Sequence, residues 1–204
     1  MKLYYTRTSP YARVVRTLIR EKGLDARVAE IEAKTRTTDS PYYAINPSGR
    51  VPFLVCDDGR GIEDSQLICA YLDRLDGKPG FCPALSEGDW SYGRLEAYAR
   101  SMTDGISVHA RETRRPETER SPGIMRHELD RARRLADFWE RELAAPAMQG
   151  PINMAQMLLL AGIDFARHVG MAELEQGRPA LQGWADRLRA RPSVATTAPR
   201  HASG

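Results

Sequence analysis

The sequence has few cysteines and no long apolar run, and these shortages exclude two classes of protein. Its 3 cysteines are an odd number and lack the CxxC or CxxH spacing of a zinc site, so we expect neither a disulfide framework nor a metal site. Cys56 and Cys69 lie in apolar stretches, and we interpret them as reduced core residues. No apolar stretch approaches the ~18 residues of a membrane span, and the first residues lack the apolar region of a signal peptide. We therefore expect a cytoplasmic protein without a membrane partner.

Charge of one sign is not in large excess either. The chain has 30 Lys and Arg residues against 27 Asp and Glu, and the net charge of +3 is spread along the sequence rather than gathered in a basic block. This distribution gives no reason to expect a nucleic acid partner. With 204 residues, of which 42% are hydrophobic, the chain is long enough for one large domain or two small ones with a core.

Strand and helix patterns alternate in the first 76 residues. The expected elements are strands at 2–5, 25–30, 51–55 and 60–62 and helices at 11–23 and 65–75. Ser9 suits the N-cap of the first helix and Pro10 its first position. Pro52 cannot donate to a strand ladder, so it must begin its strand or lie at an edge. The order β-α-β followed by β-β-α predicts an α/β domain at residues 1–76.

Only helical patterns follow this domain. Glycine and proline are too dense at residues 77–83 to extend a helix, so we place a linker at 77–88. Helical periodicity then covers residues 90–115 and 124–143, and residues 155–165 are apolar nearly all round, which is typical of a helix buried on every side. We expect an all-helical domain at 89–195 and a disordered tail at 196–204.

Four motifs together resemble those of glutathione S-transferases. They are the turn at residues 5–13, the NPSGRVPFL segment at 46–54, the Asp64-Ser65 helix start and the buried helix with its cap at 150–165. They occur in the family's order over almost the whole chain, and the turn is most similar to that of a poorly characterised bacterial branch. The resemblance implies a thioredoxin-like domain that binds glutathione, an all-helical second domain and a homodimer.

The resemblance also implies which residues hold the backbone of glutathione. Pro52 would be cis and would present the backbone of Val51 to the cysteinyl part of the tripeptide. The hydroxyl and amide of Ser65 would bind the γ-glutamyl carboxylate, and the side chain of Asp64 would meet the ammonium group. A helix start with free N–H groups suits a carboxylate, but the same two residues could serve only as helix caps.

Ser9 is the candidate partner of the glutathione thiolate. Family members activate the thiol through a hydroxyl or a cysteine in this turn, and such a hydrogen bond lowers a thiol pKa below its ordinary ~8.5. Thr6 and Thr8 offer rival hydroxyls, and Ser9 could be a helix cap alone. The turn contains no cysteine, which separates the chain from the thiol-transfer and dehydroascorbate-reducing classes.

Basic and apolar residues complete the candidate site. Lys34 and Arg50 could bind the glycyl carboxylate, although surface charges without a specific role are common. The candidates for a pocket that holds the electrophile are Tyr11, Met102, Ile106 and His109. Tyr11 could instead be an exposed or dimer-facing ring, and His109 a packed histidine.

The function implied by the resemblance is an enzyme that stabilises the glutathione thiolate and transfers it to a small hydrophobic electrophile. It needs glutathione as a substrate and neither a metal nor a further cofactor. One alternative is a binding or regulatory protein without turnover, like the stringent-starvation proteins that act with RNA polymerase. Another is a glutathione-dependent peroxide or disulfide reductase.

Overall fold

The computed structural model describes residues 1–83 and 90–199, which fall into two units. The N-terminal unit comprises Met1–Pro83 together with the chain from Pro192 onward, and the helical unit is Ala84–Arg191. Residues 84–89 of the predicted linker and 200–204 of the predicted tail lie outside the described residues.

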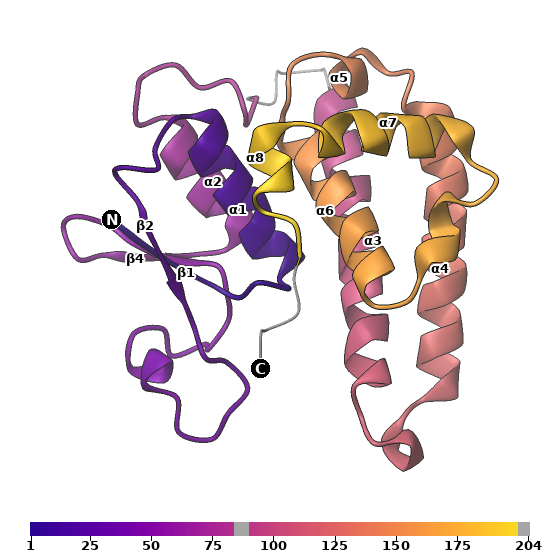
Figure 1. Ribbon diagram of the computed structural model, residues 1–204, viewed down its shortest axis with the longest axis horizontal. Helices are drawn as coiled ribbons and strands as arrows, with labels where there is room; N and C mark the ends of the chain where they lie inside the picture. Colours follow the sequence, from indigo (N-terminus) through magenta and orange to yellow (C-terminus); the bar gives the residue numbers. More distant parts are fainter. Residues whose placement is uncertain (84–89, 200–204) are drawn as a thin grey trace. The chain divides into compact units, whose positions relative to one another are not determined.

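Four short strands form the sheet of the N-terminal unit (Figure 1). They are β1 (Lys2–Tyr5), β2 (Ala29–Glu32), β3 (Phe53–Val55) and β4 (Gly61–Glu63), in the spatial order β2-β1-β3-β4. β1 is parallel to β2 and antiparallel to β3, which is antiparallel to β4. Leu3 and Leu54 lie opposite each other and are fully buried. Tyr4 and Phe53 project to the other face, where they pack with Tyr42 of the short helix η1 (Pro41–Ala44).

Two strand boundaries differ from the sequence prediction. β2 begins at Ala29 rather than at residue 25, because a turn in which Leu24 O accepts hydrogen bonds from Arg27 N and Val28 N occupies residues 24–28. β3 begins at Phe53, after Pro52, which has no N–H to give to the ladder. The other strands lie within one residue of the expected positions.

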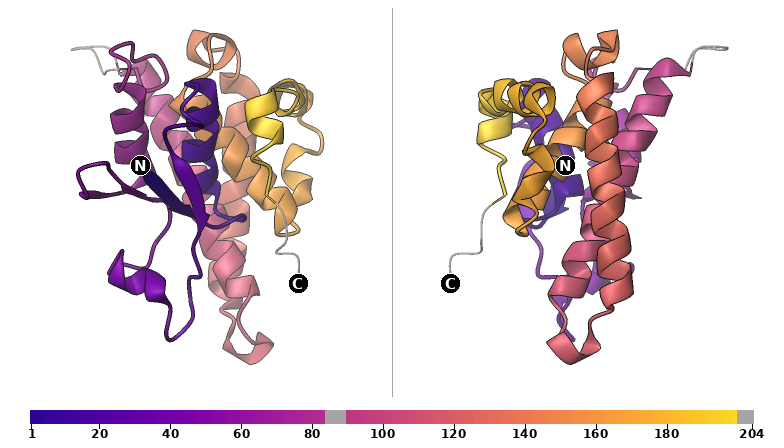
Figure 2. Two further views of the ribbon diagram at one scale, coloured as in Figure 1. Left: turned by 60° about the vertical axis from the view of Figure 1, so that its left-hand side comes forward. Right: turned by 90° about the vertical axis from the view of Figure 1, so that its right-hand side faces the viewer.

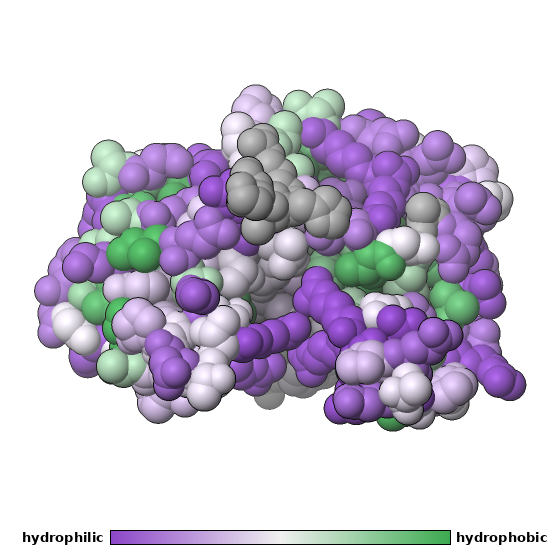
Figure 3. Space-filling view, turned by 60° about the horizontal axis from the view of Figure 1, so that its bottom comes forward, coloured by the Kyte–Doolittle hydropathy of each residue, from purple (hydrophilic) through white to green (hydrophobic). Residues whose placement is uncertain are grey.

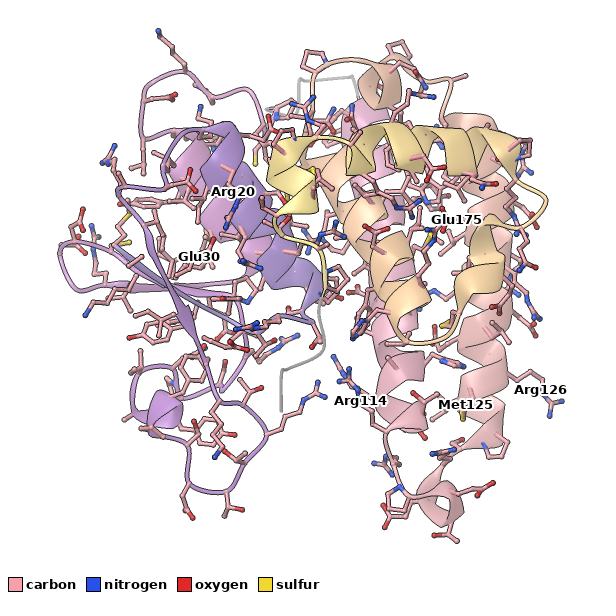
Figure 4. The ribbon with its side chains drawn as sticks, in the orientation of Figure 1. Arg20, Glu30, Arg114, Met125, Arg126 and Glu175 are labelled. Carbon is pink, nitrogen blue, oxygen red and sulfur yellow. The ribbon has the colours of Figure 1, made fainter. Side chains whose placement is uncertain are left out.

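Helices α1 (Pro10–Glu21) and α2 (Ser65–Asp73) lie side by side in the same unit (Figures 1 and 2). Ser9 caps α1 as predicted, since its Oγ accepts a hydrogen bond from Ala12 N at 3.2 Å. Ion pairs tie α1 to β2. The guanidinium of Arg20 points toward the carboxylate of Glu30 (Figure 4), with Nη1 and Oε1 2.5 Å apart.

The end of the described chain packs on α1, which corrects the expected domain boundary and tail. α8 (Pro192–Ala195) belongs to the N-terminal unit, where Arg13 Nη2 donates to Val194 O and the hydroxyls of Thr17 and Thr197 are 3.0 Å apart. Thr197 is only 1% exposed. Thr197 of the predicted tail is therefore held against α1, because its hydroxyl bonds to that of Thr17.

The helical unit is built around a helix pair and one buried helix. α3 (Ser91–Thr113) and α4 (Pro122–Glu142) run antiparallel, joined by η2 (Glu117–Glu119), and α6 (Met154–His168) packs on α3. All residues of α6 from Met154 to Ala166 are buried, as the sequence predicts. The smaller elements of the unit are α5 (Pro146–Gln149), η3 (Ala172–Glu175) and α7 (Pro179–Arg189).

The face drawn in Figure 3 has small, separate hydrophobic spots among hydrophilic residues. Within residues 1–83 and 90–199, no helix has the length and the apolar character needed to cross a membrane.

Candidate functional site

The strand pairings bring the predicted site segments of the N-terminal unit to one edge of the sheet. Tyr5 pairs with Glu32, Tyr4 lies opposite Phe53, and Phe53 lies opposite Glu63. These pairs join the last residues of β1, β2 and β4 to the first residue of β3. The chain therefore leaves the sheet here at residues 6, 33 and 64, and it enters β3 here from residue 52. All four candidate segments, 6–9, 33–34, 50–52 and 64–65, therefore meet at the same edge.

Two helices also begin at this edge, because α1 follows β1 and α2 follows β4 directly. The first N–H groups of a helix have no partner within the helix and carry partial positive charge. Two such ends at one edge create an environment that favours an anion, whether a carboxylate or a thiolate.

Asp64 caps α2 with part of its side chain. Its Oδ1 accepts hydrogen bonds from Gln66 N at 2.8 Å and from Leu67 N at 3.3 Å. The residue is exposed, with a φ of 78° that is uncommon for a residue other than glycine. Its Oδ2 has no hydrogen-bond partner within the described part of the chain. Capping therefore leaves one carboxylate oxygen available.

Ser65 is the first residue of α2 and is only 3% exposed. Neither its hydroxyl nor its backbone N–H forms a hydrogen bond with any residue in the ranges 1–83 and 90–199. Ser65 Oγ is not one of the fully buried, unpaired side-chain atoms of the described residues, so the oxygen is open to a ligand. An unpaired hydroxyl and N–H at a helix start are therefore suited to bind a carboxylate from outside the chain.

Val51 offers a second pair of free groups. The peptide bond from Val51 to Pro52 is cis, the isomer that the resemblance implies. No residue that the structure describes forms a hydrogen bond with the N–H or the C=O of Val51, and the residue is partly exposed. This backbone can therefore pair with an extended peptide, as a strand edge does.

A buried polar network supports the segment before Val51. Asn46 Nδ2 donates to Arg50 O and to Glu63 Oε2, both at 3.0 Å, while its Oδ1 accepts from Ser48 N at 3.2 Å. Tyr42 Oη donates to the same Arg50 carbonyl at 2.5 Å. In the sequence, Asn46 stands out only as part of a motif, and Tyr42 and Glu63 do not stand out at all. An acidic residue two positions before the predicted ligand serine was the one local signal for Glu63.

The hydroxyls of the first turn leave the choice among Ser9, Thr6 and Thr8 open. Ser9 Oγ accepts its capping hydrogen bond from Ala12 N, so its own hydrogen is free to be donated. Thr6 and Thr8 are also partly exposed in the same turn. The structure places all three hydroxyls before α1, and the helix cap does not prevent Ser9 from donating to a thiolate.

Lys34 and Arg50 are both exposed, and no carboxylate among the described residues pairs with either side chain. The backbone of each is held nevertheless, because Ser40 Oγ donates to Lys34 O at 2.5 Å and the Arg50 carbonyl accepts from the network described above. Arg7 lies at this edge as well, but its Nε is paired with Glu32 Oε2 at 2.8 Å. Lys34 and Arg50 are thus the two unpaired cations of these segments.

The residues predicted for the electrophile pocket differ in exposure. Tyr11 on α1 is partly exposed, whereas Met102 and Ile106 on α3 are 1% and 0% exposed. His109, also on α3, is partly exposed, and burial lowers its pKa despite the nearby carboxylates of Glu173 and Glu128. Its Nδ1 is buried without a hydrogen-bond partner in the described ranges. The pocket stays a prediction.

Comparison with known proteins gives consistent matches. The family model of the glutathione S-transferase N-terminal domain matches residues 3–80. Glutathione S-transferase 2 of Saccharomyces cerevisiae is 31% identical, and the match covers 95% of this chain and 88% of the yeast protein. The uncharacterized GST-like protein YibF of Escherichia coli is 26% identical over 98% of both chains.

The solved structures agree with the sequence matches. A glutathione transferase family member from Pseudomonas fluorescens Pf-5, crystallised with bound glutathione, has a TM-score of 0.88 and 25% identity, and 98% of both chains is covered. The likeness confirms the predicted fold, a thioredoxin-like domain followed by an all-helical one.

Proposed function

Because the chain belongs to the glutathione S-transferase family, we propose that it binds glutathione at the edge of its N-terminal sheet and transfers the thiolate to a small hydrophobic electrophile. The observation that carries this proposal is Ser65, whose hydroxyl and N–H are unpaired at the start of α2.

The γ-glutamyl end of glutathione binds at the start of α2. Its carboxylate accepts hydrogen bonds from the hydroxyl and N–H of Ser65, where the positive end of the helix favours the negative charge. Its ammonium group meets Asp64 Oδ2, the oxygen that is not used for capping. The N–H and C=O of Val51 pair with the cysteinyl backbone. The glycyl carboxylate is bound by Lys34 or Arg50.

The thiol then lies near the first turn, where Ser9 donates a hydrogen bond to the sulfur. This bond and the start of α1 lower the thiol pKa, so that the thiolate is present at neutral pH. The thiolate sulfur attacks the electrophilic carbon and forms a C–S bond. The leaving group departs with its electron pair, or a proton completes the product when the electrophile is an activated alkene.

We further propose a cytoplasmic homodimer, with the second substrate held by Tyr11, Met102, Ile106 and His109. Met102 and Ile106 are 1% and 0% exposed, so they would form an apolar layer beneath the residues that touch the substrate. The unpaired Nδ1 of His109 supports a polar contact if the ligand reaches it.

Calorimetric titration of glutathione tests the binding site. We expect wild type to bind and Ser65→Ala to bind about 30-fold more weakly, the factor for roughly 2 kcal/mol of hydrogen bonding to a carboxylate. Ser121→Ala is the matched control, because Ser121 Oγ caps α4 in the helical unit by accepting from Ile124 N. Absence of binding to wild type would reject the proposed function.

Turnover separates the transferase from the two alternatives. With an aryl halide as electrophile, the enzyme produces the glutathione conjugate at a rate that depends on Ser9. Glutathione binding without conjugation of aryl halides or activated alkenes would favour a regulatory protein, and oxidation of glutathione by peroxide would favour a reductase.

A further inference from the structure

The carbonyl group of Arg50 is held by two donors at once. Tyr42 Oη donates to it at 2.5 Å and Asn46 Nδ2 at 3.0 Å. Arg50 is exposed and its side chain takes no part in these bonds. Two hydrogen bonds on this backbone carbonyl fix the orientation of the whole peptide group between Arg50 and Val51.

That peptide group ends in the N–H of Val51. The bond from Arg50 to Val51 is trans, so its C=O and N–H point in opposite directions. When Tyr42 and Asn46 hold the carbonyl on the protein side, the N–H points away from them, and it has no acceptor among residues 1–83 and 90–199.

We propose that Tyr42 and Asn46 are positioning residues that fix the Arg50–Val51 peptide plane and thereby present the backbone of Val51 to glutathione. This inference rests on the proposed function, since it assigns Val51 to the cysteinyl part of glutathione. It adds two residues that act through the backbone and do not touch the ligand.

Asn46 is itself oriented by its neighbours. Its Oδ1 accepts from Ser48 N, and its amide hydrogens face Arg50 O and the carboxylate of Glu63, which also accepts a hydrogen bond from Ser48 Oγ. Glu63 is the last residue of β4 and lies opposite Phe53, so the network is anchored to the sheet. A carboxylate at position 46 would face two acceptor oxygens and could not replace the amide.

Tyr42 is oriented by packing. Its ring lies 5.5 Å from that of Tyr4, centroid to centroid, and the residue is 3% exposed. Burial raises the pKa of Tyr42, so its hydroxyl keeps its proton and donates at neutral pH. Phenylalanine would keep the packing and remove the donor to Arg50 O, together with the acceptor that Tyr42 Oη offers to Asn46 Nδ2 at 3.3 Å.

Tyr42→Phe with Tyr43→Phe as its matched control tests the inference. The neighbouring Tyr43 Oη accepts from Thr37 N at 3.3 Å and does not bond to Arg50. By calorimetry, we expect the Kd for glutathione to rise about fivefold in Tyr42→Phe, the usual effect of one lost hydrogen bond, and to stay unchanged in Tyr43→Phe.

Hydrogen exchange of the Val51 amide, followed by NMR, distinguishes positioning from a general loss of stability. Saturating glutathione slows this exchange in wild type and in Tyr43→Phe. In Tyr42→Phe, we expect the protection to be about fivefold smaller, in proportion to the weaker hydrogen bond. A change in unfolding temperature without this loss of protection would overturn the inference.

Asn46→Asp is the stronger variant, because it turns a donor into an acceptor beside Glu63 Oε2 and Arg50 O. Glu63→Gln is the conservative counterpart, since its amide oxygen still accepts from Asn46, and we expect its Kd to rise much less than that of Asn46→Asp. If Asn46→Asp does not fold, the positioning role is tested by Tyr42→Phe alone. Wild type that binds no glutathione contradicts the proposed function, whereas unchanged affinity and Val51 protection in Tyr42→Phe contradict only the positioning role.

Discussion

The two ends of α2 treat a buried polar side chain in opposite ways. Ser65, at the first position, is 3% exposed and has no hydrogen-bond partner among the described residues. Asp73, at the last position, is fully buried, and its carboxylate accepts from the N–H groups of residues 80–82 and from Lys22 Nζ. A satisfied buried group stabilises a fold, and an unsatisfied one beside a helix start is available to a ligand. The comparison assigns stability to one end of the helix and binding to the other.

The largest effect is expected for Asp73→Ala. This change leaves three N–H groups and part of the Lys22 charge without their acceptor, and we expect the free energy of unfolding to fall by about 3 kcal/mol. Urea unfolding measures it. Asp76→Ala, which removes the exposed partner of the same lysine, is the control and should cost much less. Equal losses of unfolding free energy in the two variants would contradict a stabilising role for the buried carboxylate of Asp73.

Ser9→Ala is expected to act on the ligand through the start of the other helix, α1. Loss of a hydrogen bond to the thiolate should raise the pKa of bound glutathione by about one unit, the equivalent of roughly 1.4 kcal/mol. The absorbance of the thiolate as a function of pH measures this pKa. Thr6→Val and Thr8→Val test the rival hydroxyls, and a rise in either of these variants instead of Ser9→Ala would reassign the thiolate partner.

The dependence of the unfolding free energy on acid pH gives a smaller test of the role of Asp73. Burial alone would raise the pKa of Asp73, but the surrounding N–H groups and Lys22 outweigh burial and lower the pKa below its ordinary 3.8. A carboxylate with a depressed pKa stabilises the fold above its ordinary pKa and loses that contribution as the pH falls through its folded-state pKa.

The difference in unfolding free energy between wild type and Asp73→Asn should therefore be constant from about pH 7 to 5 and narrow below about pH 4. Urea unfolding at several pH values measures this difference. A difference that widens in acid would contradict the assigned direction.

Local signals in the sequence predicted the elements that local chemistry controls. Ser9 and Pro10 marked the start of α1, and Pro52 set the start of β3, because each acts through its own backbone or its nearest neighbours. The apolar character of residues 155–165 predicted the buried α6. The resemblance added Ser65 and Val51, which no periodicity distinguishes from other helix-start and loop residues.

Long-range contacts determine the features that the sequence does not reveal. Thr17 and Thr197 are 180 residues apart in the chain, and neither sequence position indicates that residues 192–199 pack on α1. Asp73 lies inside the predicted helix at 65–75, where nothing sets it apart from other polar residues, and its acceptor role depends on the path of residues 80–82. Glu63 and Asn46 meet only because β4 and β3 are paired.

The glutathione-induced rise in unfolding temperature, measured side by side on Asp73→Asn and Ser65→Ala, tests most directly whether the two ends of α2 differ in role. Ligand binding stabilises a protein according to its affinity for the folded state. We predict that Asp73→Asn unfolds at a lower temperature than wild type and keeps the glutathione-induced rise. Ser65→Ala should unfold near the wild-type temperature and lose most of the rise. A full rise in Ser65→Ala, or its loss in Asp73→Asn, would contradict the account.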